Sequence, residues 1–225
     1  MNRDTAVVRI NDAIGFRPTG HALESKIILR LQEAQRDLES GKTLPRFLLL
    51  EDQTFTLPLG EHAVALPTDF IRLDDSNLPH FTNFDTFLPT YLEVVRDYSR
   101  AVKQLITLQR PGEPQMTVLA PRMFVIRKST IDFITTADRD YELAWNYYKA
   151  GALLTSNIEN EWLGDTTGGS EWLIAEAGYR VALDLRDPDA LKLFDDMRTR
   201  ARSAVFGDIL ADEDSGGPIV MGANN

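Results

Sequence analysis

The chain of 225 residues contains no cysteine. This absence excludes a disulfide scaffold, catalysis by a thiolate and zinc sites built from cysteine. The chain also has no run approaching the roughly 18–20 apolar residues that a membrane-spanning helix needs. Its polar beginning, Met1 to Asp4, is unlike a signal peptide. We therefore expect a soluble protein that is made in the cytoplasm and has no membrane partner.

The sequence motifs of common enzyme classes are missing as well. No phosphate-binding loop of the Walker type is present, because the Gly-Gly pairs at 168–169 and 216–217 lack the lysine and the strand–helix context. A Gly-x-Ser-x-Gly motif is also absent. His21, His62 and His80 fall in predicted turns and loops, with no partner at metal-ligand spacing. We therefore predict no catalytic residue, no cofactor and no metal.

Two groups of acidic residues keep one enzymatic alternative open. Asp74 and Asp75 are adjacent, and Glu159 and Glu161 flank Asn160. Two well-placed carboxylates suffice for the hydrolysis of cell-wall glycan. Neighbouring acids on a loop are more often a solvated surface, and the sequence does not indicate which pair would act.

Acidic residues outnumber basic ones by 34 to 24, which gives a net charge of −10. Proteins that grip nucleic acid use Lys and Arg to neutralise phosphates, so this charge argues against such a role. It is compatible with a channel through which DNA passes, because an acidic wall does not retain DNA. Acidity also favours solubility.

Hydrophobic periodicity predicts helices at both ends of the chain. Residues 5–14 and 22–40 have helical spacing of apolar residues, and so do residues 171–185. Asp187-Pro188 is typical of a capped helix start, and that helix is expected to end near Phe206. The expected buried face of residues 171–185 is Trp172, Ala175, Tyr179 and Leu183. The expected buried stripe of the last helix is Ala190, Phe194, Met197, Ala201 and Val205.

The middle of the chain has the pattern of strands and tight turns. Short apolar or alternating runs are separated by proline and glycine. The predicted strands are 46–50, 53–57, 63–66, 91–95, 116–119, 123–126 and 130–135. A short helix is predicted over 97–107. Residues 141–148 could continue into a helix, but their alternation favours a strand.

These patterns predict an α+β fold. Residues 1–42 and 152–206 are expected to form a helical bundle, into which a strand-rich module of residues 43–151 is inserted. Residues 207–225 are acidic and rich in glycine, with two small apolar clusters. Such a segment cannot pack a core by itself, so a flexible C-terminal tail is predicted.

Five residues of the helical part are candidate interface residues. Arg198, Arg200 and Arg202 cluster near the predicted end of the last helix. They either interact with the helix C-terminus or contact an acidic partner surface or DNA. Trp162 and Trp172 flank a glycine-rich loop and are either core residues or anchors for a partner.

Four stretches, taken in order, carry a family resemblance. The first is Ala65-Leu66-Pro67-Thr68-Asp69-Phe70-Ile71-Arg72-Leu73, and the second is 89–95 with its following helix and the turn at 111–114. The third runs from Tyr147-Tyr148 to Leu163. The fourth joins Glu176-Ala177-Gly178 to Met197. Together they resemble the head-to-tail connector, or portal adaptor, proteins of short-tailed phages and their relatives, over residues 22–206. Residues 74–87 and 164–169 depart from that family.

The resemblance implies a viral structural protein at the head–tail junction of the virion. About twelve copies would form a ring beneath the portal protein, extend the DNA channel without specific DNA binding, and provide a platform for a tail or nozzle protein. The C-terminal segment would reach the portal. The docking residues expected there are Ile209, Leu210, Ile219, Val220 and Met221. The alternatives are a virion-associated cell-wall hydrolase and a DNA-binding terminase-type or regulatory protein, which the charge disfavours.

Overall fold

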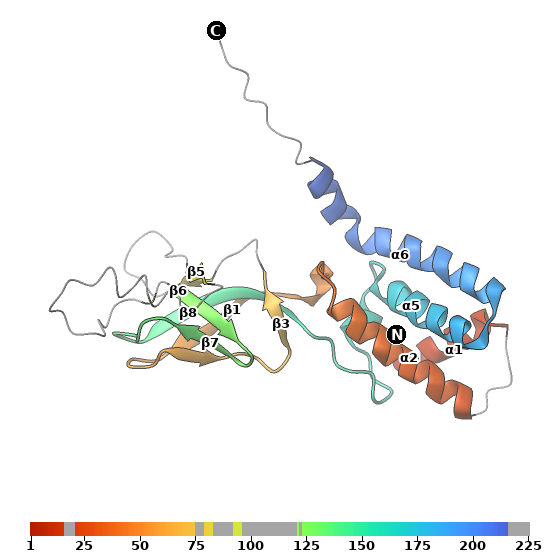
Figure 1. Cartoon of the computed structure of the whole chain (residues 1–225), viewed down its shortest axis with the longest axis horizontal. Coiled ribbons are helices and arrows are strands. Elements are labelled where there is room, and N and C mark those ends of the chain that lie inside the picture. Colours follow the sequence, from red (N-terminus) through yellow and green to blue (C-terminus); the bar gives the residue numbers. More distant parts are fainter. Residues whose placement is uncertain (16–20, 75–78, 83–91, 96–120, 122, 216–225) are drawn as a thin grey trace, which may run out of the picture. The chain divides into compact units, whose positions relative to one another are not determined.

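A computed structural model describes residues 1–15, 21–74, 79–82, 92–95, 121 and 123–215. The chain contains helices and two sheets and is therefore of the predicted α+β class. It divides into two compact units (Figure 1). The helical unit comprises residues 1–48 and 151–225, and the strand unit comprises residues 49–150.

The helical unit is organised around one buried helix, α5 (Gly169–Leu185), which packs against α1, α2, α4 and α6. Nine of its 17 residues are buried, including Leu173 and Val181. The other elements of the unit are α1 (Arg3–Ala13), α2 (His21–Glu39), the 3₁₀-helix η1 (Arg46–Leu48), α4 (Glu161–Gly164) and α6 (Pro188–Ser215). The sequence predicted the helices over 5–14, 22–40 and 171–185 in nearly these positions.

The predicted face of α5 is buried only in part. Trp172 and Ala175 are buried and Tyr179 is half-buried, but Leu183 is 50% exposed. Leu183 lies in the last turn of α5, before Arg186 ends the helix in a left-handed conformation. Periodicity gives the direction of a side chain, but it does not show whether a neighbouring element reaches that turn.

Helix α6 begins as predicted and ends later than predicted. The Asp187 carboxylate accepts a hydrogen bond from the Ala190 N–H at 3.1 Å, which caps the start. The helix does not end at Phe206 but continues through Gly207 to Ser215. Gly207 does not adopt the left-handed conformation that ends many helices. Ile209 and Leu210 therefore lie in α6 and not in a flexible tail, whereas Ile219, Val220 and Met221 lie outside the described residues.

The strand unit contains two sheets. In one, β8 (Tyr141–Lys149) lies between β1 (Leu49–Leu57) and β3 (Phe70–Leu73), and β4 (His80–Phe81) also pairs with β8. In the other, the order is β2 (Ala63–Ala65), β7 (Thr130–Phe133), β6 (Met123–Arg127) and β5 (Glu93–Val94). The prediction of a strand over 141–148 is confirmed.

The strand predicted over 46–50 begins later than expected, at Leu49. Arg46–Leu48 is a 3₁₀ turn and not the start of a strand, because the Leu48 N–H binds the Pro45 carbonyl at 3.1 Å. The helix predicted over 97–107 and the strand predicted over 116–119 lie outside the described residues.

Strand β8 brings four aromatic or aliphatic side chains into the core of the strand unit: Tyr141, Leu143, Trp145 and Tyr147. Its partner β1 is antiparallel, and Leu49 pairs with Tyr148 at the start of the ladder. Residues directly opposite each other in such a ladder are about 4.5–5.5 Å apart. The two ends of the strand unit therefore lie side by side.

Candidate interface groove on the helical unit

A chain of aromatic rings runs through the core of the helical unit. Phe47, Trp162, Trp172 and Phe206 come from η1, α4, α5 and α6, and successive ring centroids are 5.1, 5.9 and 5.1 Å apart. Each pair is edge-to-face, an arrangement that aromatic rings favour. These contacts connect four separate segments of the chain.

The two candidate tryptophans occupy different positions in this row of aromatic rings. Trp162 is fully buried, and its indole N–H donates a hydrogen bond to Glu39 at 2.9 Å. In the structure it is a core residue with no surface to offer a partner. Trp172 is 9% exposed and reaches the surface, where it lines a groove together with Phe206.

This groove lies between the end of α2 and helices α5 and α6, and its volume is about 730 Å³. Leu38, Trp172 and Phe206 supply its apolar surface. Its charged residues are the cations Lys42, Arg180, Arg198 and Arg202 and the anions Asp37 and Glu176. Four cations against two anions make the groove positive, in a chain whose net charge is −10.

The cations of the groove differ in how they are neutralised. Arg180 pairs with Asp37 at 2.7 Å and with Glu176 at 3.0 Å. Arg198 pairs with Asp195 at 2.6 Å and lies 4.5 Å from the centre of the Tyr179 ring.

Lys42 and Arg202 are exposed and have no ion-pair partner among the residues that the structure describes. They supply the positive charge available to a ligand.

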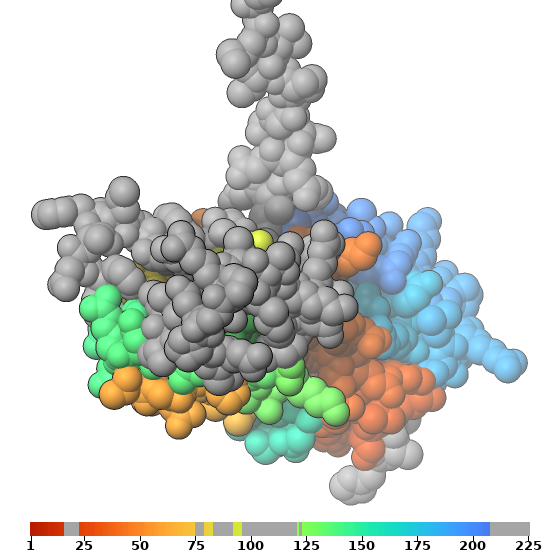
Figure 2. Space-filling model, turned by 60° about the vertical axis from the view of Figure 1, so that its left-hand side comes forward, coloured from red at the N-terminus to blue at the C-terminus, as the bar shows by residue number. Residues whose placement is uncertain are grey.

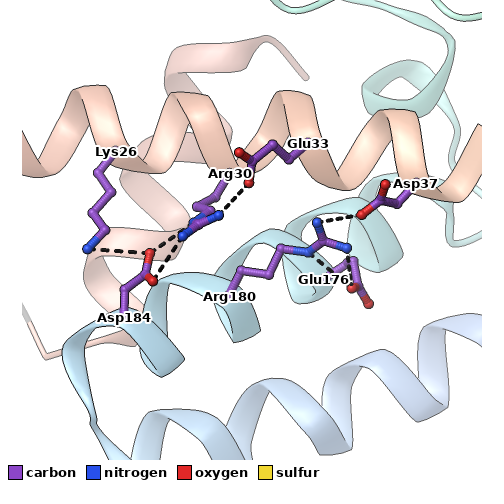
Figure 3. A network of polar contacts seen from close by, with 7 residues as sticks. All are labelled: Lys26, Arg30, Glu33, Asp37, Glu176, Arg180 and Asp184. Atoms are coloured by element: carbon purple, nitrogen blue, oxygen red, sulfur yellow. Dashed lines mark hydrogen bonds and ion pairs between the residues drawn. The ribbon is translucent and has the colours of Figure 1, made fainter.

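A ladder of ion pairs holds α2 against α5 and positions one side of the groove (Figure 3). Asp184 on α5 accepts two hydrogen bonds from Arg30 on α2, both at 2.9 Å, and lies 3.4 Å from Lys26. The hydrogen bonds from Arg30 lower the pKa of Asp184. Further along the two helices, Arg180 bridges Asp37 and Glu176.

The three candidate arginines do not act as one cluster. Arg198 and Arg202 line the groove, whereas Arg200 lines a second hollow of about 370 Å³ beside Gly168 and Met197. Residues two apart on a helix point in nearly opposite directions. Since α6 ends only at Ser215, the arginines do not lie in its last turn, and the interpretation that they stabilise the helix C-terminus is wrong.

The acidic residues considered for catalysis have structural contacts. Glu159 accepts a hydrogen bond from the Met1 amino group at 2.7 Å, and Glu161 accepts one from the Ala152 N–H at 3.0 Å. Asp74 is buried, and Asp75 lies outside the described residues.

The three histidines are separated along the fold. His21 begins α2, His62 precedes β2, and His80 lies in β4. In the described part of the chain, no three His, Asp or Glu side chains gather as metal ligands would.

Sequence reasoning found part of the groove and missed the rest. Trp172, Arg198 and Arg202 were candidates, but Lys42 and Arg180 were not. The only signal for Arg180 was its spacing of four residues from Glu176, which is typical of an ion pair along a helix. Lys42 follows the end of α2, far from α6 in sequence, so its place in the groove depends on tertiary packing.

No protein-family model matches the chain, and no curated protein is significantly similar to it. Within the described ranges, no helix combines the length and the apolar character needed to cross a bilayer. The residues that line the groove are therefore the evidence that it is an interface.

Proposed function

We propose that this chain is a phage head-to-tail adaptor. About twelve copies form a ring below the portal protein, extend the DNA channel and provide the attachment platform for a tail or nozzle protein. The observation that carries the proposal is the division of the chain into a helical unit and a strand unit, each with its own core. An adaptor needs separate surfaces for the components above and below it.

The helical unit supplies the contacts to neighbouring copies and to the portal, and the strand unit faces the tail. The groove with Trp172, Arg198 and Arg202 supports the first assignment, because it combines apolar surface with available positive charge. Portal docking uses the C-terminal end of the chain, with Ile219, Val220 and Met221 as apolar anchors.

DNA passes through the ring without specific binding, since the net charge of −10 opposes attachment to phosphates. The protein is located at the head–tail junction of the virion, after assembly in the host cytoplasm. The portal provides the template on which the copies assemble into the ring.

The test is the recovery of tagged chain from a lysate of infected cells. Mass spectrometry identifies the co-purifying proteins, and negative-stain microscopy images them. Rings stacked on portal, with portal and tail proteins as the main partners, are the expected result. Recovery of a lone chain with no virion protein contradicts the adaptor function.

A chain that ends at Ser215 provides the matched variant for the docking segment. It retains α6 and removes Ile219, Val220 and Met221. We expect portal binding to weaken while the far-ultraviolet circular dichroism of the helices is unchanged. Equal portal binding by the shortened chain would show that residues 216–225 do not dock on the portal. The negative-stain images test the ring separately.

A further inference from the structure

The groove on the helical unit combines positive charge with apolar surface. Its available cations, Lys42 and Arg202, are exposed, and both lie beside the apolar surface of Leu38, Trp172 and Phe206. A partner that fits both features carries acidic side chains next to aliphatic ones. Such mixed surfaces, with an apolar centre and a charged rim, are typical of protein interfaces.

The end of α6 has this composition. Residues 208–214 read Asp-Ile-Leu-Ala-Asp-Glu-Asp, with four acidic residues and two large aliphatic ones. Arg202 is the last basic residue of the chain, so the sequence from 203 onward carries only negative side-chain charge. One chain therefore contains both a positive, partly apolar groove and a negative, partly apolar helix end.

The last acidic residues of α6 lie beyond the groove of their own copy. Arg198, Arg202 and Phe206 on α6 line the groove, and α6 continues from Phe206 as a helix to Ser215. At 1.5 Å per residue, residues 212–214 lie about 9–12 Å further along the helix axis than Phe206. Figure 1 shows the last turns of α6 extending away from α5.

We propose that residues 208–214 of α6 bind in the groove of a second copy of this chain. Glu213 is three and four residues beyond Leu210 and Ile209, so the three share one face of the helix. Glu213 faces Lys42 and Arg202 of the neighbour, Ile209 and Leu210 cover its Trp172 and Phe206, and Asp212 and Asp214 add negative charge on either side. Ile209 and Leu210 thus serve the contact between copies and not the portal. The contact involves the chain alone and does not rest on the adaptor function.

The contact joins two different surfaces, one from each copy. Such a head-to-tail contact leaves one groove and one helix end free in every dimer. Further copies can therefore add until the series closes into a ring or continues as a filament.

Charge reversal tests the contact in the purified full chain. One variant carries Lys42→Glu and Arg202→Glu, a second carries Asp212→Lys, Glu213→Lys and Asp214→Lys, and a third combines all five changes. Sedimentation velocity at rising protein concentration and low salt measures self-association. We expect the wild type to associate, each of the first two variants to associate about tenfold or more weakly, and the combined variant to recover.

A matched control carries Arg36→Glu and Lys192→Glu. These exposed cations lie outside the groove and have no ion-pair partner in the described part of the chain. The control changes the net charge as much as the groove variant does, and it should associate like the wild type. Far-ultraviolet circular dichroism establishes that every variant is folded.

Three results would overturn the proposal. The first is a wild type that stays monomeric at several hundred micromolar, and the second is equal weakening by the control and groove variants. The third is binding of short duplex DNA by the wild type that the groove variant loses, since this would assign the groove to phosphates. None of these experiments involves portal or tail proteins, so their failure is distinct from failure of the adaptor function.

Discussion

Phe194 lies against the backbone of α5 because residue 178 has no side chain. A Cβ atom placed on Gly178 would lie 2.3–2.6 Å from three atoms of the Phe194 ring, closer than real Cβ contacts allow. Gly207, in the extension of α6, has no atom within 4 Å of the same position. The two glycines are both helical, but only the first is required by packing.

Gly178→Ala is expected to lower the free energy of unfolding by about 1–3 kcal/mol, because α5 and α6 must separate or Phe194 must leave its rotamer. Gly207→Ala should instead raise stability by up to about 1 kcal/mol, because alanine favours the helix. Urea unfolding of both variants measures the difference. Equal effects of the two substitutions would contradict the close packing of α5 on Phe194.

At the residue scale, the sequence predicted local features better than burial. The cap by Asp187 needs only residues that are neighbours in the chain, and it is present at the predicted place. The position of Trp162 in the core depends on Glu39, Phe47 and Trp172, which lie in other elements. The sequence alone therefore does not show whether a tryptophan beside a glycine-rich loop is buried in the core or exposed to a partner.

Helices α2 and α5 are joined by charge as well as by apolar contacts. The side chains of Asp184 and Arg30 are 21% and 30% exposed, so their two hydrogen bonds are only partly weakened by solvent. The pKa of Asp184 in the folded chain is lowered by Arg30. The carboxylate therefore stabilises the fold fully above the ordinary carboxyl pKa, and this stabilisation is lost as the pH falls through the lowered value.

Asp184→Asn is expected to cost about 0.5–1.5 kcal/mol of unfolding free energy near pH 7. The difference from the wild type should shrink at acid pH, below the ordinary carboxyl pKa, as the wild-type carboxylate takes up its proton. Urea unfolding at both pH values measures it. Asp196→Asn on the exposed face of α6 is the control and should have little effect at either pH. A difference that does not depend on pH would contradict the role of the Asp184 charge.

The end of helix α6 could not be predicted from the sequence. Gly207 follows the last apolar residue of the predicted stripe, and a glycine in that place commonly ends a helix. In the structure it continues the helix, as do Ile209, Leu210 and Ala211. The outer face of α6 is exposed along much of its length (Figure 2). Residues 208–215 contain only two large apolar residues, Ile209 and Leu210, so the sequence carries no apolar stripe from which the end of the helix could be read.

At the scale of the whole molecule, the two ends of the strand unit lie beside each other. Leu49 and Tyr148 are paired, so a short connection can replace everything between Leu48 and Gly151. We expect a chain in which residues 49–150 are replaced by about four Gly and Ser residues to keep its helices and unfold in one cooperative transition. Circular dichroism during thermal unfolding measures this. A helical signal that fades without a transition would mean that the helical unit needs the strand unit.

The sequence predicted the order of helices, strands and helices, and it predicted the α+β class. It placed the change from helices to strands at residues 42/43, whereas the two units meet at 48/49. The difference arises because residues 44–48 contribute Leu44, Phe47 and Leu48 to the packing of the helical unit after α2 has ended. Neither pattern nor composition distinguishes such a segment from the strand that follows it.

The packed rings of Phe47, Trp162, Trp172 and Phe206 also contribute to the optical signal of the chain. Fixed aromatic rings produce near-ultraviolet circular dichroism, which disappears when tertiary packing loosens even if the helices persist. Because Phe206 lies on α6 and its ring contacts Trp172, a shift of α6 against α5 alters this signal without any loss of helix. Near-ultraviolet circular dichroism can therefore detect a movement of α6 at the edge of the groove without any added label.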